Sequence, residues 1–435
     1  MEQQSCDVLV IGSGMGGMCA AALLVQAGLK TVVVERLPKI GGRCSTRDYK
    51  GFKLATGVDL LSLGGGIEQI FNDVGAKYEL TEASMDVWRI GGKDHELPGK
   101  GQLRSVIHLL TDEDKDETER VWGALRRALS WHEPSDNISL RDWLLGYTRN
   151  QRLLKGFDGL ALIFLGEYAR ETPAGEFFRF LRAPRPSRLG FPPNGCLAVM
   201  ESLSGAIQGK GAVVWTSCEA KEIVVKDGVA KGAVVQKGED RIEIAAKFVI
   251  SDAGPKKTVE MAGSVNFDEG YLKLIREVLR PSVGICIEAA TDKPLLQYPV
   301  LNLPEADSVV QVFCPTLLCP ELAPRGKHLL WAMGLLRSSL PPYRFAEEEE
   351  LCMRDLRKFF PGFENAEILE VKYLSEDYYP FFHSCPGYSL PQKTPVMNLY
   401  NVGDGVMPSG QVATMACEAS ARSAVQDIKM RTGRA

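Results

Sequence analysis

A glycine-rich segment near the start of the sequence has the spacing that binding of a dinucleotide requires. Residues 12–17 read Gly-Ser-Gly-Met-Gly-Gly, a complete G-x-G-x-x-G pattern. Gly12 permits a tight turn, Gly14 lets the backbone approach a pyrophosphate, and Gly17 lets a helix pack closely on a strand. Glu35 follows 18 positions after Gly17, and its carboxylate can accept hydrogen bonds from a ribose hydroxyl. The predicted chemistry is recognition of phosphate and ribose.

The elements predicted around this segment place it at a helix terminus. Residues 7–11 are a short apolar run typical of a buried parallel strand, and residues 31–34 form a second such run. Residues 18–27 are rich in alanine, are followed by Gly28, and are typical of a helix. The order strand, turn, helix, strand distinguishes a dinucleotide site from an ordinary glycine-rich turn. Free N–H groups at the helix N-terminus then face the phosphates.

The residues that follow indicate which nucleotide is bound. Residues 35–46 resemble the E-x-x-x-x-x-G-G-R-x-x-T extension of FAD-dependent amine oxidases and phytoene desaturase-like enzymes, and this resemblance implies FAD rather than NAD. Gly41 and Gly42 permit a second close approach of the backbone, and Arg43 can meet a phosphate.

The similarity continues to Gly57, through a segment that the family places beside the isoalloxazine ring of the flavin. This chain departs from the family at two positions there. Ala55 stands in place of the usual acid, and Asp59 stands where the family often has a histidine. We therefore expect the contacts on the reacting side of the flavin to differ from those of the family.

A second group of family-like residues lies in the later parts of the sequence. A strand ending at Gly403 and Asp404, followed by a helix that begins near Val412, resembles the Gly-Asp motif and flavin-capping helix of the family. The resemblance implies that Asp404 accepts hydrogen bonds from ribityl or phosphate-linked hydroxyls, and that the helix N-terminus stabilises charge on the reduced flavin. Residues 248–255 resemble another strand end of the family, and Ala220 stands where its backbone meets adenine.

These parts predict an α/β fold with a Rossmann-type FAD-binding domain, glutathione reductase-like in the amine oxidase and phytoene desaturase arrangement, and an interleaved α+β substrate domain. We expect the FAD-binding domain over residues 1–68, 196–260 and 395–435, and the substrate-binding or cap domain over 69–195 and 261–394. The predicted cofactor-binding residues are Gly12, Gly14, Gly16, Gly17, Glu35, Arg36, Gly41, Gly42, Arg43, Gly57, Ala220, Gly403, Asp404 and Val412.

The reaction predicted from these features is oxidation or reduction at carbon. There is one dinucleotide motif, so electrons pass to or from oxygen, a quinone, a partner protein or transiently bound NAD(P)H. Amine oxidases of the family carry a lysine near flavin N5, and residues 280–287, the comparable stretch, contain none. This favours desaturation, saturation or isomerisation of C–C bonds in an apolar, isoprenoid or alicyclic substrate. Two alternatives are a flavin amine oxidase and a flavin-free prenyl-protein chaperone of the GDP-dissociation-inhibitor type.

Three side chains are candidates for catalysis. Asp59, if desolvated, would have a raised pKa and could act as general acid or base, whereas its structural alternative is to cap a turn or pair with a cation. His383 and Tyr379 lie shortly before the Gly-Asp motif, where a tyrosine could contribute to an aromatic cage. A structural role remains the alternative for His383.

Composition limits the partners. With 51 basic and 55 acidic side chains the formal net charge is −4, so no nucleic-acid partner is expected. We expect a cytoplasmic protein without a signal peptide or membrane span, with eleven reduced cysteines and no metal site. Residues 177–188 mix arginine with phenylalanine, which indicates either a peripheral membrane contact or an ordinary solvated helix face.

Overall fold

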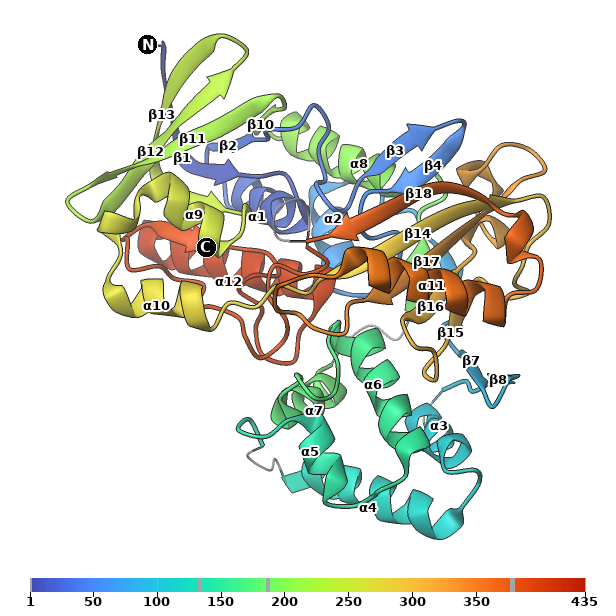
Figure 1. The fold of residues 1–435 in the computed structure, drawn as a ribbon. Coiled ribbons are helices and arrows are strands. Elements are labelled where there is room, and N and C mark those ends of the chain that lie inside the picture. Colours follow the sequence, from blue (N-terminus) through green and yellow to red (C-terminus); the bar gives the residue numbers. More distant parts are fainter. Residues whose placement is uncertain (1, 100, 132–134, 185–187, 376–379, 435) are drawn as a thin grey trace.

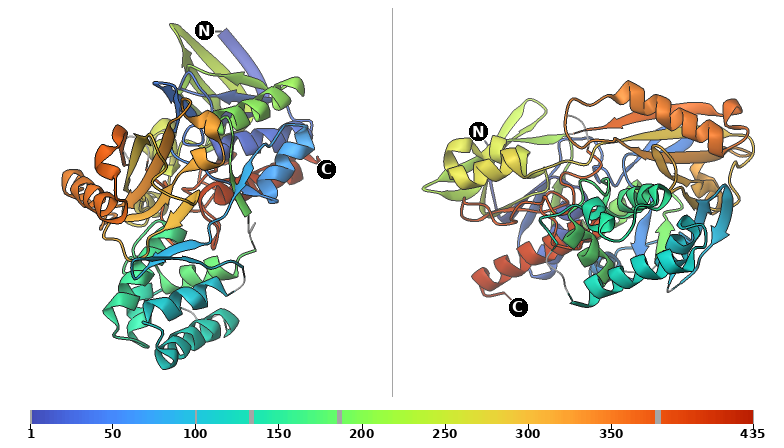
Figure 2. Two further views of the ribbon diagram at one scale, coloured as in Figure 1. Left: turned by 90° about the vertical axis from the view of Figure 1, so that its right-hand side faces the viewer. Right: turned by 60° about the horizontal axis from the view of Figure 1, so that its bottom comes forward.

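Two large β-sheets and a separate group of helices make up the molecule. The computed structural model describes residues 1–435 except 1, 100, 132–134, 185–187, 376–379 and 435. The two sheets lie side by side, and the helices α3 to α7 form a group below them in the same view (Figure 1). Turning the molecule keeps this helical group apart from the first sheet (Figure 2).

The first sheet contains the strand that precedes the glycine-rich segment. Its strands are β1 (Glu2–Ile11), β2 (Thr31–Val34), β10 (Val213–Trp215), β11 (Cys218–Lys226), β12 (Val229–Lys237), β13 (Asp240–Ser251) and β19 (Leu399–Asn401). β1 lies between β2 and β13 and is parallel to both, and β19 runs parallel to the end of β13. The carboxyl ends of β1, β2, β13 and β19 therefore meet at one edge of the sheet.

Helices cover both faces of this sheet because successive side chains of a strand point to opposite faces. Val8 and Val10 pack against α1 (Met15–Gln26), α2 (Gly66–Val74), α8 (Cys196–Gly209) and α12 (Ala413–Thr432). Leu9 and Ile11 face the other side, where α9 (Pro255–Ala262) and α10 (Glu269–Glu277) lie. The small side chains of α1, Ala20 to Ala22, are fully buried and let α12 approach closely.

The second sheet is mostly antiparallel and lies beside the first sheet. Its strands are, in spatial order, β18 (Glu367–Leu374), β14 (Gly284–Thr291), β17 (His328–Leu335), β16 (Val309–Phe313), β15 (Val300–Asn302), β7 (Val87–Ile90) and β8 (Lys93–Glu96). Helix α11 (Phe345–Phe359) covers one face, where Cys352 and Leu356 pack against Ile285 and Ile287. The opposite face carries Leu329 and Leu369, which pack against the hairpin of β3 (Thr46–Tyr49) and β4 (Phe52–Ala55).

The helical group and two minor elements complete the fold. The helices are α3 (Gln102–Leu110), α4 (Lys115–Trp131), α5 (Leu140–Leu145), α6 (Gln151–Leu165) and α7 (Ala174–Arg182). A small sheet joins β5 (Leu61–Leu63), β9 (Arg188–Phe191) and β6 (Thr81–Ala83). Single 3₁₀ turns occupy Ser264–Asn266, Pro315–Leu317, Pro320–Leu322 and Phe363–Asn365.

The phenylalanines of α7 are buried rather than exposed. Phe177 and Phe178 are fully buried in the core of the helical group. Arg179 forms ion pairs with Asp136 and Glu176. These aromatic side chains support the helical group from inside. Among the described residues, no helix combines the length and apolar character needed to cross a membrane.

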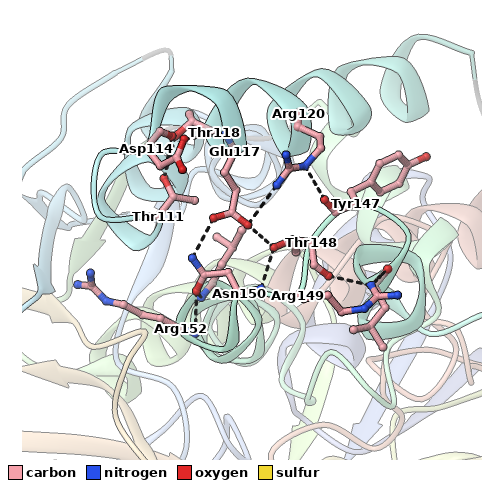
Figure 3. A network of polar contacts seen from close by, with 12 residues as sticks. Thr111, Asp114, Glu117, Thr118, Arg120, Tyr147, Thr148, Arg149, Asn150 and Arg152 are labelled. Carbon is pink, nitrogen blue, oxygen red and sulfur yellow. Dashed lines mark hydrogen bonds and ion pairs between the residues drawn. The ribbon is translucent and has the colours of Figure 1, made fainter.

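Glu117 on α4 links the turn before α6 to the rest of the helical group (Figure 3). Its Oε2 accepts a hydrogen bond from Asn150 Nδ2 at 3.0 Å, and its Oε1 accepts one from the Thr148 hydroxyl. Arg120 on the same helix donates to the Tyr147 carbonyl at 2.8 Å. The acidic segment around Glu117 is therefore not simply a solvated face, because this side chain is only 13% exposed.

We expect Glu117→Ala to lower the free energy of unfolding by about 1–3 kcal/mol, because the substitution leaves the Thr148 and Asn150 donors without their acceptor. The matched control is Glu119→Ala, whose carboxylate is 53% exposed and forms a surface ion pair with Arg104. That change should cost no more than about 1 kcal/mol. Thermal unfolding of both variants measures the difference, and equal losses would show that Glu117 is not a structural link.

Candidate functional site

The loop between β1 and α1 has the tight geometry expected of a phosphate-binding turn. Gly12 has a φ of +97°, which would strain any residue with a side chain. A Cβ atom at Gly17 would lie 2.2 Å from the Gly12 carbonyl oxygen, so only glycine allows α1 to begin this close to β1. Gly14 is the N-cap of α1 and uses no side chain for capping. The N–H groups of the first helical turn therefore face this loop, and the Gly17 amide among them donates to Asp252.

Glu35 is held at the edge of the same loop. Its Oε2 accepts hydrogen bonds from the Ser13 amide at 2.9 Å and the Ser13 hydroxyl at 2.7 Å. Its Oε1 accepts one from the Leu37 amide at 2.8 Å. The side chain is buried, and Oε1 keeps capacity for a further donor. The position suits a ribose hydroxyl.

A second glycine turn faces the first one. Gly41 and Gly42 have φ of +99° and +55°, and the Gly41 amide donates to the Ser13 carbonyl at 3.0 Å. A Cβ atom at Gly42 would lie 3.7 Å from the Gly14 Cα atom. Glycines on both sides thus keep this space clear of side chains.

Arg43 and Asp404 form a bidentate ion pair between the two family-like parts of the chain. The Arg43 Nη1 and Nη2 atoms lie 2.6 Å and 2.7 Å from the two Asp404 carboxylate oxygens. Nη1 also donates to the Phe381 carbonyl at 3.0 Å. His383 completes the group, since its Nδ1 lies 2.9 Å from Asp404 Oδ1 and 2.8 Å from Arg43 Nη2.

The Arg43 guanidinium keeps Asp404 ionised. Burial acts to raise the pKa of Asp404, but Arg43 and His383 outweigh it and hold the pKa well below its usual value. The preceding Gly403 amide donates to Ser420 Oγ on α12 at 2.9 Å. Helix α12 has Val412 as its N-cap, so the Gly-Asp motif and the start of this helix are close along the chain.

The other predicted residues are spread around this group. A Cβ atom at Gly57 would lie 2.8 Å from the Arg43 carbonyl oxygen, and one at Gly16 would lie 2.9 Å from the Gly403 amide nitrogen. Ala220 lies on β11, opposite Val235 of β12. Both strands belong to the first sheet, which also contains the strand before the glycine-rich loop. The side chain of Arg36 is at the surface. Tyr379 lies outside the described residues.

Asp59 lies next to a group of charged residues contributed by the second sheet. Its Oδ1 atom is buried, and no residue in the described part of the chain gives it a hydrogen bond. Lys372 on β18 lies with its Nζ atom 2.8 Å from Glu288 Oε2 on β14 and 3.4 Å from Glu370 Oε2. The same Nζ donates to the Ala55 carbonyl. Strand pairing thus brings a lysine and a glutamate to the segment that carries Asp59.

Both carboxyl groups in this cluster are poised to titrate near neutrality. Burial raises the pKa of Asp59 to about 7, Glu288 adds to the rise, and Lys372 opposes it. Burial likewise raises the pKa of Glu288 to about 7, against the effect of Lys372. The two carboxyls influence each other, so their protons are lost as a coupled pair.

Comparisons with known proteins agree with this arrangement. The family of NAD(P)-binding Rossmann-like domains matches residues 10–74. Prolycopene isomerase of Daucus carota is 23% identical over 94% of this chain and 78% of its own. Phytoene desaturase of Cercospora nicotianae is 26% identical over 58% of this chain and 42% of its own. An oxidoreductase from Methanosarcina mazei has a structure that superposes with a TM-score of 0.85, at 26% identity, over 97% of this chain and 100% of its own.

The chain is similar to oxidoreductases of the phytoene desaturase type. This similarity implies a flavin cofactor. The residues present fit such a group, because Gly14, Gly41 and Gly42 carry no side chains toward the space between the two glycine turns. Glu35 and the α1 N-terminus supply an acceptor and donors at that space.

The sequence alone did not reveal Lys372. The position of the amine oxidase lysine corresponds to residues 280–287 of this chain, and that stretch contains no lysine. However, Lys372 on β18 pairs across the sheet with Cys286 on β14. A lysine therefore lies in space beside the stretch 280–287. Charged residues recur along β18, as Glu367, Glu370 and Lys372, so nothing in the strand's sequence singles out Lys372.

We expect Gly14→Val to abolish flavin retention. A Cβ atom at Gly14 would lie 2.5 Å from Asp252 Oδ2, and the larger valine would displace Asp252 and distort the loop at the start of α1. The matched control is Gly205→Val on α8, where a Cβ atom meets nothing within 4 Å. Visible absorbance of the supernatant after acid precipitation measures released flavin. A Gly14→Val protein with a full complement of flavin would contradict the site assignment.

Proposed function

We propose that this protein is a FAD-dependent oxidoreductase that acts on C–C bonds of an apolar, isoprenoid or alicyclic substrate, by desaturation, saturation or flavin-assisted isomerisation. The observation that carries the proposal is the buried, unpartnered Asp59 Oδ1 beside the family's flavin segment. The named activities of the relatives, prolycopene isomerase and phytoene desaturase, support carbon chemistry of this kind.

The protein residues supply binding and proton transfer. When bound, the FAD supplies the redox step, because its N5 atom exchanges a hydride with the substrate. Glu35 would hold a ribose hydroxyl, the α1 N-terminus the diphosphate, and the α12 N-terminus near Val412 the electron-rich edge of the ring. Formation of a double bond also needs a base for the adjacent proton, and Asp59 Oδ1 is the proposed acceptor.

Beside the charged cluster around Asp59 lies a region that suits an apolar molecule. The next residue, Leu60, packs with a buried cluster that includes Phe191, Phe313 and Trp331. An apolar substrate could enter this region without leaving a charge unpaired. The proposed substrate side of the molecule is therefore the second sheet with the helical group, opposite the FAD side.

His383 has a different proposed role from Asp59. Its Nδ1 is within 2.9 Å of Asp404 and Arg43, so we propose that it orients the Gly-Asp motif rather than contacting substrate. Electrons would pass to or from oxygen, a quinone, a partner protein or transient NAD(P)H, as the single dinucleotide motif implies.

Amine oxidation is the second candidate, and Lys372 is the observation that favours it. A lysine beside the flavin is a feature of the amine oxidases that this chain resembles. The Nζ atom of Lys372 is, however, engaged by Glu288, Glu370 and the Ala55 carbonyl. We therefore rank C–C chemistry first.

Anaerobic bleaching of the flavin by a panel of substrates tests this ranking. We expect isoprenoid and alicyclic compounds to reduce the bound flavin, whereas primary amines and polyamines should leave it oxidised. Asp59 as proton acceptor and the apolar cluster beside it favour the isoprenoid and alicyclic compounds. Rapid reduction by amines, with release of an aldehyde, would reverse the ranking.

We expect Asp59→Asn to lower the rate of flavin reduction by about 10²-fold or more while flavin content stays unchanged, since the amide cannot accept the proton. Asp48→Asn on β3 is the matched control, because that carboxylate is 70% exposed and near Lys53. In the oxidative direction the rate should rise with pH through about 7, as Asp59 loses its proton.

Lys372→Met tests the same assignment through the pH profile. Lys372 lowers the pKa of Asp59, so its removal should move the midpoint of the profile to higher pH. Stopped-flow reduction across the pH range measures both variants. An unchanged rate in Asp59→Asn, or an unmoved midpoint in Lys372→Met, would remove Asp59 as the base.

A further inference from the structure

Asp252 occupies the position where the glycine-rich loop and the Gly-Asp motif meet. It follows the last residue of β13, and its amide donates to the Ile11 carbonyl at 2.8 Å. Its Oδ2 is 2.5 Å from the place of a Cβ atom at Gly14, and its Oδ1 is 2.6 Å from that at Gly16. Oδ1 is also 2.8 Å from the place of a Cβ atom at Gly403. The carboxyl therefore lies against the first turn of α1.

Charged groups from every neighbouring element act on this carboxyl. Burial is the largest effect and raises the pKa of Asp252 to about 8. The Gly17 amide on α1 and the Arg43 guanidinium lower it, while Asp404 and Glu35 raise it. The buried thiols of Cys19 and Cys417, on α1 and α12, also face it. Arg43 is paired with Asp404, so Asp404 offsets part of the effect of Arg43 on the pKa of Asp252.

A diphosphate at this loop would compete with an ionised Asp252. Both anions need the same N–H groups at the α1 N-terminus, and two negative charges in one partly buried site favour protonation of the weaker acid. A neutral carboxyl, in contrast, has an O–H donor for a phosphate oxygen. Asp252 then changes from a competitor into a ligand.

We propose that Asp252 binds the diphosphate of the cofactor as a neutral carboxylic acid, so that binding of FAD takes up one proton from solvent wherever Asp252 is ionised in the FAD-free protein. The proposal rests on FAD being the cofactor. The proton adds to one Asp252 oxygen when FAD binds and returns to solvent when FAD leaves. Flavin retention therefore weakens as pH rises, independently of any chemistry at the ring.

The test is the dissociation constant of FAD from the holoprotein, obtained from the fluorescence of released FAD at equilibrium between about pH 6 and about pH 9.5. We expect the constant of the wild-type protein to rise by up to about tenfold per pH unit above about pH 8, the slope for one proton. Asp252→Asn keeps a donor and cannot ionise, so its constant should change less than about threefold over this range.

The matched control is Asp7→Asn, a carboxylate on β1 that pairs with Lys247 away from the loop; it should keep the wild-type slope. Asp252→Ser is a second neutral variant, and it should also have a flat profile. A flat wild-type profile, or an Asp252→Asn protein with the wild-type slope, would overturn the proposal. A protein that holds no FAD even near pH 6 would overturn the cofactor assignment itself and this proposal with it.

Discussion

The ion pair between Arg43 and Asp404 is the constraint on which the site depends. It joins two residues 361 positions apart, and the Asp404 side chain is only 4% exposed. A charge buried to this extent is tolerated only when it is paired and hydrogen-bonded. The backbone of Gly57 packs against Arg43, and Gly403 is bonded to α12. Loss of either partner would leave an unpaired charge where the early and late parts of the chain meet.

Much of the first sheet and its helices could be predicted, because the motifs that specify them are short stretches of consecutive residues. Thr31–Val34 is a strand with the bounds that its apolar run indicated. Helix α1 begins at Met15 rather than Met18, because the glycines of the motif itself adopt helical geometry. Residues 69–195 were harder, since β6 to β8 are strands of three or four residues with little alternation. Such short runs pair only because a neighbouring strand is present.

The cluster around Asp59 could be predicted only in part. Its unusual carboxyl is visible from the family pattern, but Glu288 and Lys372 are separated from it by more than two hundred positions in the sequence. Their meeting depends on the register of β14 against β18, which contains an irregularity after Glu288. A shift of one residue would turn Lys372 to the opposite face. Sequence patterns do not specify that register.

The central place of β13 has a consequence for the order in which the protein is made. Val8 of β1 pairs with Phe248 of β13, so the first strand must wait for a partner synthesised much later. At about 5–20 residues per second, this delay lasts roughly 12 to 48 s. The apolar β1 edge stays available to other chains during that time. Because Asp404 is made later still, cofactor capture comes after nearly all of the chain exists, and flavin supply cannot guide the early stages of folding.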